Sequence, residues 1–183
     1  AQNANGTFDA SNTTGQDLYV IGGTNGNITL TELSNGDTVQ IGDPSAGSST
    51  FVSSGDVSLR GSGSGELNVN VVDEVDYASG DLFNDNTDFQ IDDVEVINLD
   101  LAMSGDTTVA LDLEIDYEGN SGPVTAPFSD REATDLIITG GDPNAANDLA
   151  LDNTALSDQL PGTLERIDIS GFNSDTGIGN STL

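Results

Sequence analysis

The sequence predicts an all-β protein on three observations. Apolar and polar residues alternate along short runs, which is the period of a β-strand. Clusters of Gly, Asn, Asp and Ser separate these runs at intervals of about 8–12 residues. Strong helix formers are scarce, since the chain of 183 residues has no Lys and a single Met. Only 145–160 is compatible with a helical turn or two.

The predicted strands follow one another along the whole chain. They span 8–11, 18–21, 28–33, 39–41, 51–53, 57–60, 67–72, 89–101, 109–115, 136–139, 149–151 and 164–169. Turn signals such as Asn25-Gly26, Asn35-Gly36 and Gly140-Gly141 lie between them. Such a succession is typical of a solenoid or a sandwich. We predict a stacked-coil β-solenoid, with an Ig-like β-sandwich as the alternative.

One segment interrupts the alternation. Residues 119–129 contain Pro123, Pro127 and Gly122 and no period-two pattern, which indicates a loop or linker. We therefore predict an N-terminal β module over 1–118 and a C-terminal β module over 130–183.

The charge balance limits the partners of the protein. Acidic residues number 32 against three basic ones, Arg60, Arg131 and Arg166, for a net charge of −29. Nucleic acids and anionic membrane surfaces need clustered cations and are excluded. Such a chain repels itself unless a high-salt habitat screens the charge or divalent cations bind between carboxylates. We favour calcium, because it prefers the oxygen ligands that this chain offers.

The missing residue types exclude further classes. The chain has no Cys, His or Trp, so zinc sites and His-based catalysis lose their usual groups. No apolar run approaches the ~20 residues of a membrane helix, which argues against membrane insertion. Absence of Cys suits a secreted bacterial protein. We expect an extracellular, cell-surface location and a chain that is processed or part of a longer protein.

A weak internal repeat supports stacked units. The segment 94–99 (VEVINL) matches 164–169 (LERIDI) position by position. A second pair, 17–23 (DLYVIGG) and 135–141 (DLIITGG), lies upstream of each. The spacing between the two elements differs between copies, which stacked coils tolerate because their loops protrude.

These paired motifs resemble bacterial surface-layer proteins and calcium-dependent surface adhesins of the RTX type. The resemblance touches about half of the chain and is clearest over 133–172. It implies a β-solenoid, secretion, calcium-dependent folding and assembly into a lattice or fibre. The glycine-rich nonapeptide of RTX proteins is absent, since Gly140-Gly141-Asp142 lacks the third Gly. Calcium ligands must therefore be argued from local sequence.

Three groups of oxygen-bearing side chains are candidate calcium ligands. The first lies in one short turn, the second in an Asp-rich irregular stretch, and the third alternates along a predicted strand, so that its members share one face. They are Asp142, Asn144, Asn147 and Asp148; Asp81, Asp85 and Asp88; and Asp112, Glu114 and Asp116. The alternatives are Asx-capped turns, a solvated loop and a halophilic solvent face respectively.

The sequence favours a structural role over catalysis. Glu95 and Glu165 occupy matched positions of the repeat and suit backbone capping or pairing with Arg166. Paired carboxylates also serve glycoside cleavage, but polysaccharide lyases of β-helical fold rely on cations that are scarce here. We expect no enzyme activity. The predicted function is self-assembly into a surface layer or filament, with copies of the chain joined head to tail or laterally. The alternative is an adhesin module that binds glycans or cells, and a lyase is a distant third.

Overall fold

The computed structural model describes half of the chain, in ten ranges. They are 6–21, 27–41, 57–62, 65–71, 89–101, 107–111, 113–115, 133–142, 147–151 and 164–174. Thirteen β-strands and no helix lie within them. The all-β prediction is therefore confirmed for the described residues. The predicted strand 51–53 and the possible helical turn lie wholly or largely outside these ranges.

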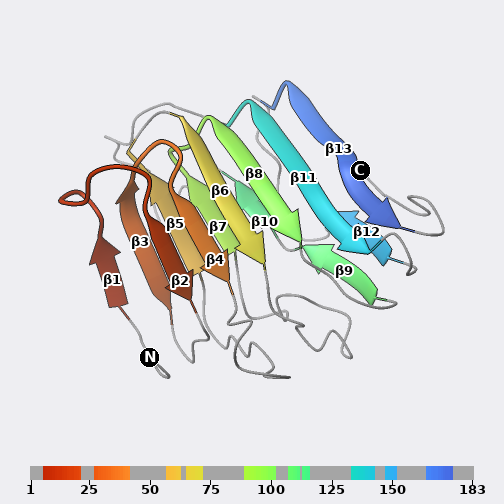
Figure 1. Cartoon of the computed structure of the whole chain (residues 1–183), viewed down its shortest axis with the longest axis horizontal. Coiled ribbons are helices and arrows are strands. Elements are labelled where there is room, and N and C mark those ends of the chain that lie inside the picture. The colour runs from red at the N-terminus through yellow and green to blue at the C-terminus, as the bar shows by residue number, and fades with distance from the viewer. Residues whose placement is uncertain are drawn as a thin grey trace, which may run out of the picture.

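The strands form two large sheets and one small sheet (Figure 1). Sheet A has the order β1 (Gly6–Asp9), β3 (Ile28–Leu33), β5 (Val57–Gly61), β7 (Phe89–Asp92) and β10 (Leu113–Ile115). Sheet B has the order β2 (Leu18–Ile21), β4 (Thr38–Ile41), β6 (Glu66–Val71), β8 (Val96–Leu101), β11 (Asp135–Asp142) and β13 (Arg166–Ser174). The third sheet pairs β9 (Thr107–Leu111) with β12 (Asn147–Leu151).

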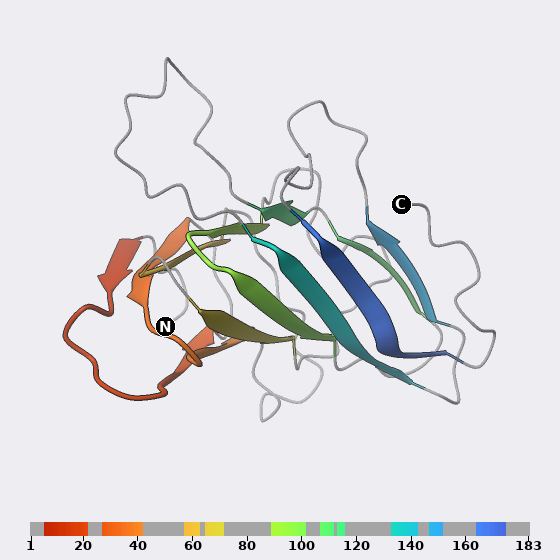
Figure 2. The same cartoon turned by 90° about the horizontal axis from the view of Figure 1, so that it is seen from above.

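Every pair among the described strands is parallel, and the chain alternates between the large sheets. From β1 to β8 the odd strands belong to sheet A and the even strands to sheet B. Figure 2 shows the strands of sheet B side by side, with β13 beside β11. Because consecutive strands lie in opposite sheets, strands that are neighbours within a sheet come from successive passes of the chain.

The core lies between the sheets and is built of rows of aliphatic side chains. In sheet B, Val39, Val69, Leu99 and Ile138 are paired across four strands and are each at most 1% exposed. Sheet A contributes buried residues such as Leu59 to the same cluster. Because successive side chains of a strand point to opposite faces, the apolar residues of the alternating pattern all face the core. Each buried aliphatic side chain contributes about 1.5–3 kcal/mol.

Two predicted strands are each divided in the structure. The run 89–101 is broken between β7 and β8, so that its two halves lie in different sheets. The corner contains Asp93, whose φ of 57° is left-handed. Aspartate visits this region more readily than most residues. The run 109–115 is likewise split, since β9 pairs with β12 whereas β10 pairs with β7.

The strand pairing confirms one half of the internal repeat and corrects the other. Ile97 and Ile167 both pair with Leu136, so the matched segments 94–99 and 164–169 occupy equivalent places. The sequence match of 17–23 to 135–141 aligns Leu18 with Leu136, but the strand pairing does not. Followed from strand to strand, the pairs that begin at Leu18 reach Ile137, one residue further along. A one-residue slip reverses the faces of a strand. Leu18 is accordingly 60% exposed, whereas Leu136 is fully buried.

Sheet B is continuous where the sequence suggests two modules. Strand β8 precedes the predicted linker and β11 follows it, and the two are paired from Val96–Asp135 to Leu101–Gly140. Residues 119–129 lie outside the described ranges, so the division at that segment stays a prediction. The described ranges also contain no helix with the length and apolarity of a membrane span.

Candidate functional site

The predicted calcium ligands lie mostly outside the described residues. Asp142 ends β11, while Asn147 and Asp148 begin β12, so these three flank the turn in which the site was expected. Glu114 is the middle residue of β10. The remaining candidates fall outside the described ranges: Asn144, Asp81, Asp85, Asp88, Asp112 and Asp116. Within the residues that are described, no three His, Cys, Asp or Glu side chains gather as a possible metal centre.

The described polar side chains instead bond from strand to strand. On the outer face of sheet B, Asn98 Nδ2 donates to Asn68 Oδ1 at 3.1 Å and also to Glu66. Asn68 Nδ2 in turn lies 3.3 Å from the carbonyl oxygen of Asp37. Side chains thereby link β8 to β6, and β6 to the residue that precedes β4, in addition to the backbone hydrogen bonds. Stacked amides of this kind reinforce parallel β-structure.

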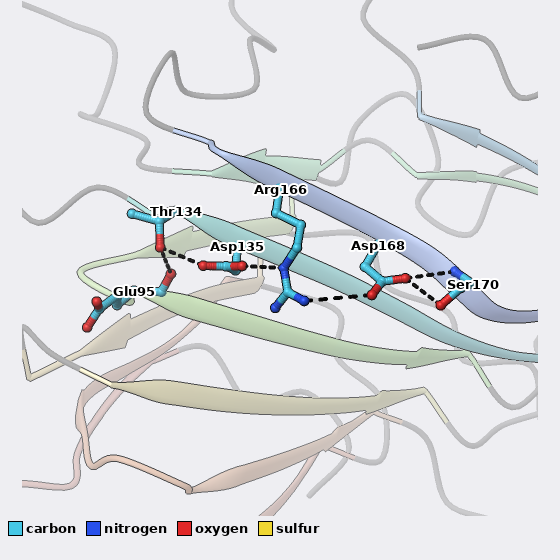
Figure 3. Close-up of polar contacts among 6 residues, drawn as sticks. All are labelled: Glu95, Thr134, Asp135, Arg166, Asp168 and Ser170. Atoms are coloured by element: carbon cyan, nitrogen blue, oxygen red, sulfur yellow. Dashed lines mark hydrogen bonds and ion pairs between the residues drawn. The ribbon is translucent and has the colours of Figure 1, made fainter.

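Arg166 connects the last two strands of sheet B (Figure 3). Its Nε donates to Asp135 Oδ1 at 2.5 Å, and its Nη1 lies 3.8 Å from Asp168 Oδ2. Thr134 Oγ1 donates to the other oxygen of Asp135 at 2.8 Å. Asp168 also accepts from the backbone and hydroxyl of Ser170. The partner proposed from the sequence for Arg166 was a glutamate; the described partners are two aspartates.

These bonds lower the pKa of both aspartates. The hydrogen bond from Arg166 is the main cause for Asp135, and that from the Ser170 hydroxyl is the main cause for Asp168. Both carboxylates are thus stabilised in their charged form. Their contribution to stability is present above the ordinary value of 3.8 and is lost as the pH falls through the lowered pKa.

We expect Arg166→Gln to weaken the fold at neutral pH and to lose this effect in acid. Removing the guanidinium removes the stabilisation of two carboxylates that are charged only above their pKa values. Urea unfolding midpoints of the wild type and the variant should therefore differ at pH 7 and converge as the pH falls through the lowered pKa values. Arg166→Lys, which keeps the charge, should lie between them. An equal difference at every pH would contradict the assigned role.

Arg60 makes a second charged bridge at the corner of sheet A. Its Nη2 lies 2.8 Å from Asp92, and its Nε donates to Asp93 at 2.9 Å. The pKa of Asp92 is raised, first by burial and then by the charge of Asp93. Two of the three arginines of the chain therefore each hold two carboxylates, at least one of which belongs to a neighbouring strand.

Two aspartates, Asp17 and Asp37, directly precede the neighbouring strands β2 and β4. Asp37 is fully buried, and its two oxygens accept the backbone N–H groups of Asp17 at 2.9 Å and Ser34 at 2.8 Å. Its position aligns with Leu67 of the next strand, one residue before the pair Thr38–Asn68. A carboxylate takes the place of an aliphatic side chain here because it accepts hydrogen bonds from the backbone at two corners of the chain. Among the described residues, none bonds to the buried Oδ2 of Asp17.

Both ends of sheet B leave apolar side chains incompletely covered. At the first end, Leu18 and Val20 of β2 are 60% and 55% exposed. Phe8, 51% exposed, meets Tyr19 edge to face with ring centroids 5.9 Å apart. At the other end, the partly buried side chains packed on the core are Leu164, Ile167 and Ile169. Leu18 and Val20 thus lie on the outer face of β2, whereas the side chains that pack on the core at the two ends are partly buried.

Sequence reasoning did not find these contacts. The pairs join residues about 30 apart, such as Asp135 with Arg166 and Arg60 with Asp93, and depend on the strand register. The usable signal was the scarcity of arginine, because each cation in so acidic a chain must attract carboxylates.

Comparisons of the chain with protein-family models, curated proteins and solved structures gave no match.

Proposed function

We propose that this chain is an extracellular structural protein that folds as a β-solenoid and assembles with copies of itself into a surface layer or filament. The observation that carries the proposal is the strand order. Parallel strands alternate between two sheets from β1 to β8, as successive turns of a coil would. An Ig-like sandwich is antiparallel, so the parallel pairing favours the solenoid.

The use of the polar side chains supports a structural role. Asn68 and Asn98 bond along the stack, and Arg166 joins β11 to β13. Polar groups that bond between strands stabilise a long, rigid surface. Asp100 follows the same rule, because it accepts the hydroxyl of Thr139 at 3.2 Å.

Calcium is part of the proposed function because the many negative charges of the chain need counter-ions. A net charge of −29 opposes compaction and, even more, the approach of a second copy. The described arginines Arg60 and Arg166 already hold two carboxylates each. Divalent cations between the remaining carboxylates would relieve the repulsion. The favoured ligands are Asp142, Asn147 and Asp148, which lie at the end of β11 and the start of β12.

Calcium removal tests this function. In dilute buffer, millimolar calcium is expected to raise the thermal unfolding midpoint and to convert monomers into sedimenting polymers, whereas chelator should reverse both effects. Circular dichroism, analytical ultracentrifugation and electron microscopy provide the measurements. Magnesium at equal ionic strength is the control for screening. If calcium changes neither the thermal unfolding midpoint nor the sedimentation, the proposal is contradicted. A calcium-loaded monomer that binds glycans would favour the adhesin alternative.

A further inference from the structure

We propose that copies of this chain join end to end, with β13 of one copy pairing in parallel with β2 of the next, so that sheet B continues across the junction. This inference rests on the proposed self-assembly and specifies its interface. It is carried by the two outer strands of the sheet, by the apolar rows that end on them, and by the local balance of charge.

Strand β2 is an edge strand that lacks the features by which edge strands usually avoid pairing with another chain. Its sequence, LYVI, has no charged residue and no proline, and its single neighbour among the described strands is β4. Leu18 and Val20 are more than half exposed although they are apolar. Natural edge strands usually carry charges, prolines or bulges that prevent pairing with another chain. The absence of such devices marks β2 as a strand that accepts a partner.

Strand β13 is the opposite edge of the same sheet. Its neighbour among the described strands is β11, with which it runs parallel. Ile167 and Ile169 pack on the core but stay partly exposed, whereas Leu136, the partner of Ile167, and Ile138 of β11 are fully buried. The inward apolar rows therefore end on partly buried side chains, at Ile167 and Ile169 of β13 and at Tyr19 of β2.

The partner that fits both edges is a second copy. All strands of sheet B run in one direction, so β13 and β2 pair in parallel when one copy is placed after another. The row that contains Leu18 ends at Asp168. Continuing that row across the junction sets Ile169 beside Tyr19, and apolar side chains cover one another. The two edges differ, so the contact is heterologous and propagates into a filament.

The two edge strands of this junction carry no net charge, although the chain as a whole is strongly acidic. Strand β2 carries no charge. On β13, the guanidinium of Arg166 pairs with Asp168 and with Asp135 of β11. The repulsion that opposes contact elsewhere on a surface of net charge −29 is therefore reduced here.

A charge placed on the edge tests the junction. Leu18→Glu/Val20→Glu puts two carboxylates on the outer face of β2, where both side chains are exposed, so the monomer should keep its circular dichroism and thermal midpoint. The matched control is Thr38→Glu/Gln40→Glu, which adds the same charge in the same rows one strand further in. We expect the edge variant to stay monomeric in calcium, and the control to polymerise as the wild type does.

Cross-linking supplies an independent readout, since the chain has no native cysteine. Parallel neighbours lie about 4.8 Å apart, within the Cα separation of a disulfide. Mild oxidation of Leu18→Cys/Asp168→Cys should give covalent ladders, and Leu18→Cys/Glu95→Cys should not. A wild type that never polymerises would overturn the proposed function. A wild type that polymerises, with an edge variant that polymerises equally and no ladders, would overturn the junction alone.

Discussion

Replacing Asp37 by alanine is expected to destabilise the protein by about 2–4 kcal/mol, because two partly buried backbone N–H groups lose their acceptor at once. These groups belong to Asp17 and Ser34, at two different corners of the chain. The carboxylate has no exposure to solvent, so water does not substitute for it without opening the corner. Urea unfolding followed by circular dichroism measures the change.

Companion variants separate hydrogen bonding from packing at this position. Asp37→Asn keeps one acceptor oxygen and should cost roughly half as much as alanine. Asp37→Leu places an aliphatic group in line with Leu67, yet it should still destabilise, since it accepts no hydrogen bond. Asp100→Ala removes an exposed carboxylate of the same sheet with one hydrogen bond, from Thr139, and as the control it should cost much less than Asp37→Ala. A leucine variant more stable than the wild type would refute the role given to Asp37.

The second large effect is expected at Gly140, where alanine should cost about 2–6 kcal/mol. The residue has φ of 101°, a conformation that strains any residue with a side chain by about 1–3 kcal/mol. A Cβ atom would also lie 2.1 Å from the carbonyl oxygen of Leu101 on β8, and relieving such a contact costs about 1–3 kcal/mol more. Chemical denaturation provides the measurement.

Gly6→Ala is the matched control for Gly140→Ala. Gly6 lies in β1, has no positive φ, and an added Cβ would meet nothing within 4 Å. Its substitution should leave the unfolding midpoint close to that of the wild type. Equal midpoints for the two alanine variants would show that β11 and β8 do not approach each other as closely as described.

Most strands could be predicted because their signal is local. Period-two alternation located β2 and β3 with their observed bounds, and β4, β5 and β6 within one residue. The corner between β7 and β8 was missed because it contains no Gly or Pro; the one local sign of it is the break in alternation at Asp92-Asp93, two polar residues in a row. Asp93 and Val94 are both buried, so two consecutive side chains turn inward where the backbone changes sheet.

Register was harder to predict than strand position. Leu18 and Leu136 sit in nearly identical sequences, yet one faces solvent and the other the core. The local sequence is compatible with either face, and the pairing with strands 20–40 residues away decides between them. The same limit applies to the site. Turn composition identified Asp142, Asn147 and Asp148 as candidates, but it carried no information on which carboxylates Arg60 and Arg166 would meet.

The parallel order of sheet B has a mechanical meaning. Hydrogen bonds between neighbouring strands point along the direction in which the strands succeed one another, so tension applied between β2 and β13 opens one ladder at a time. Thr38, Asn68 and Asn98 are neighbours 30 residues apart. Each detached strand would thus release about 100 Å of chain. A sheet built in this way would lengthen in steps under load and dissipate work with each step.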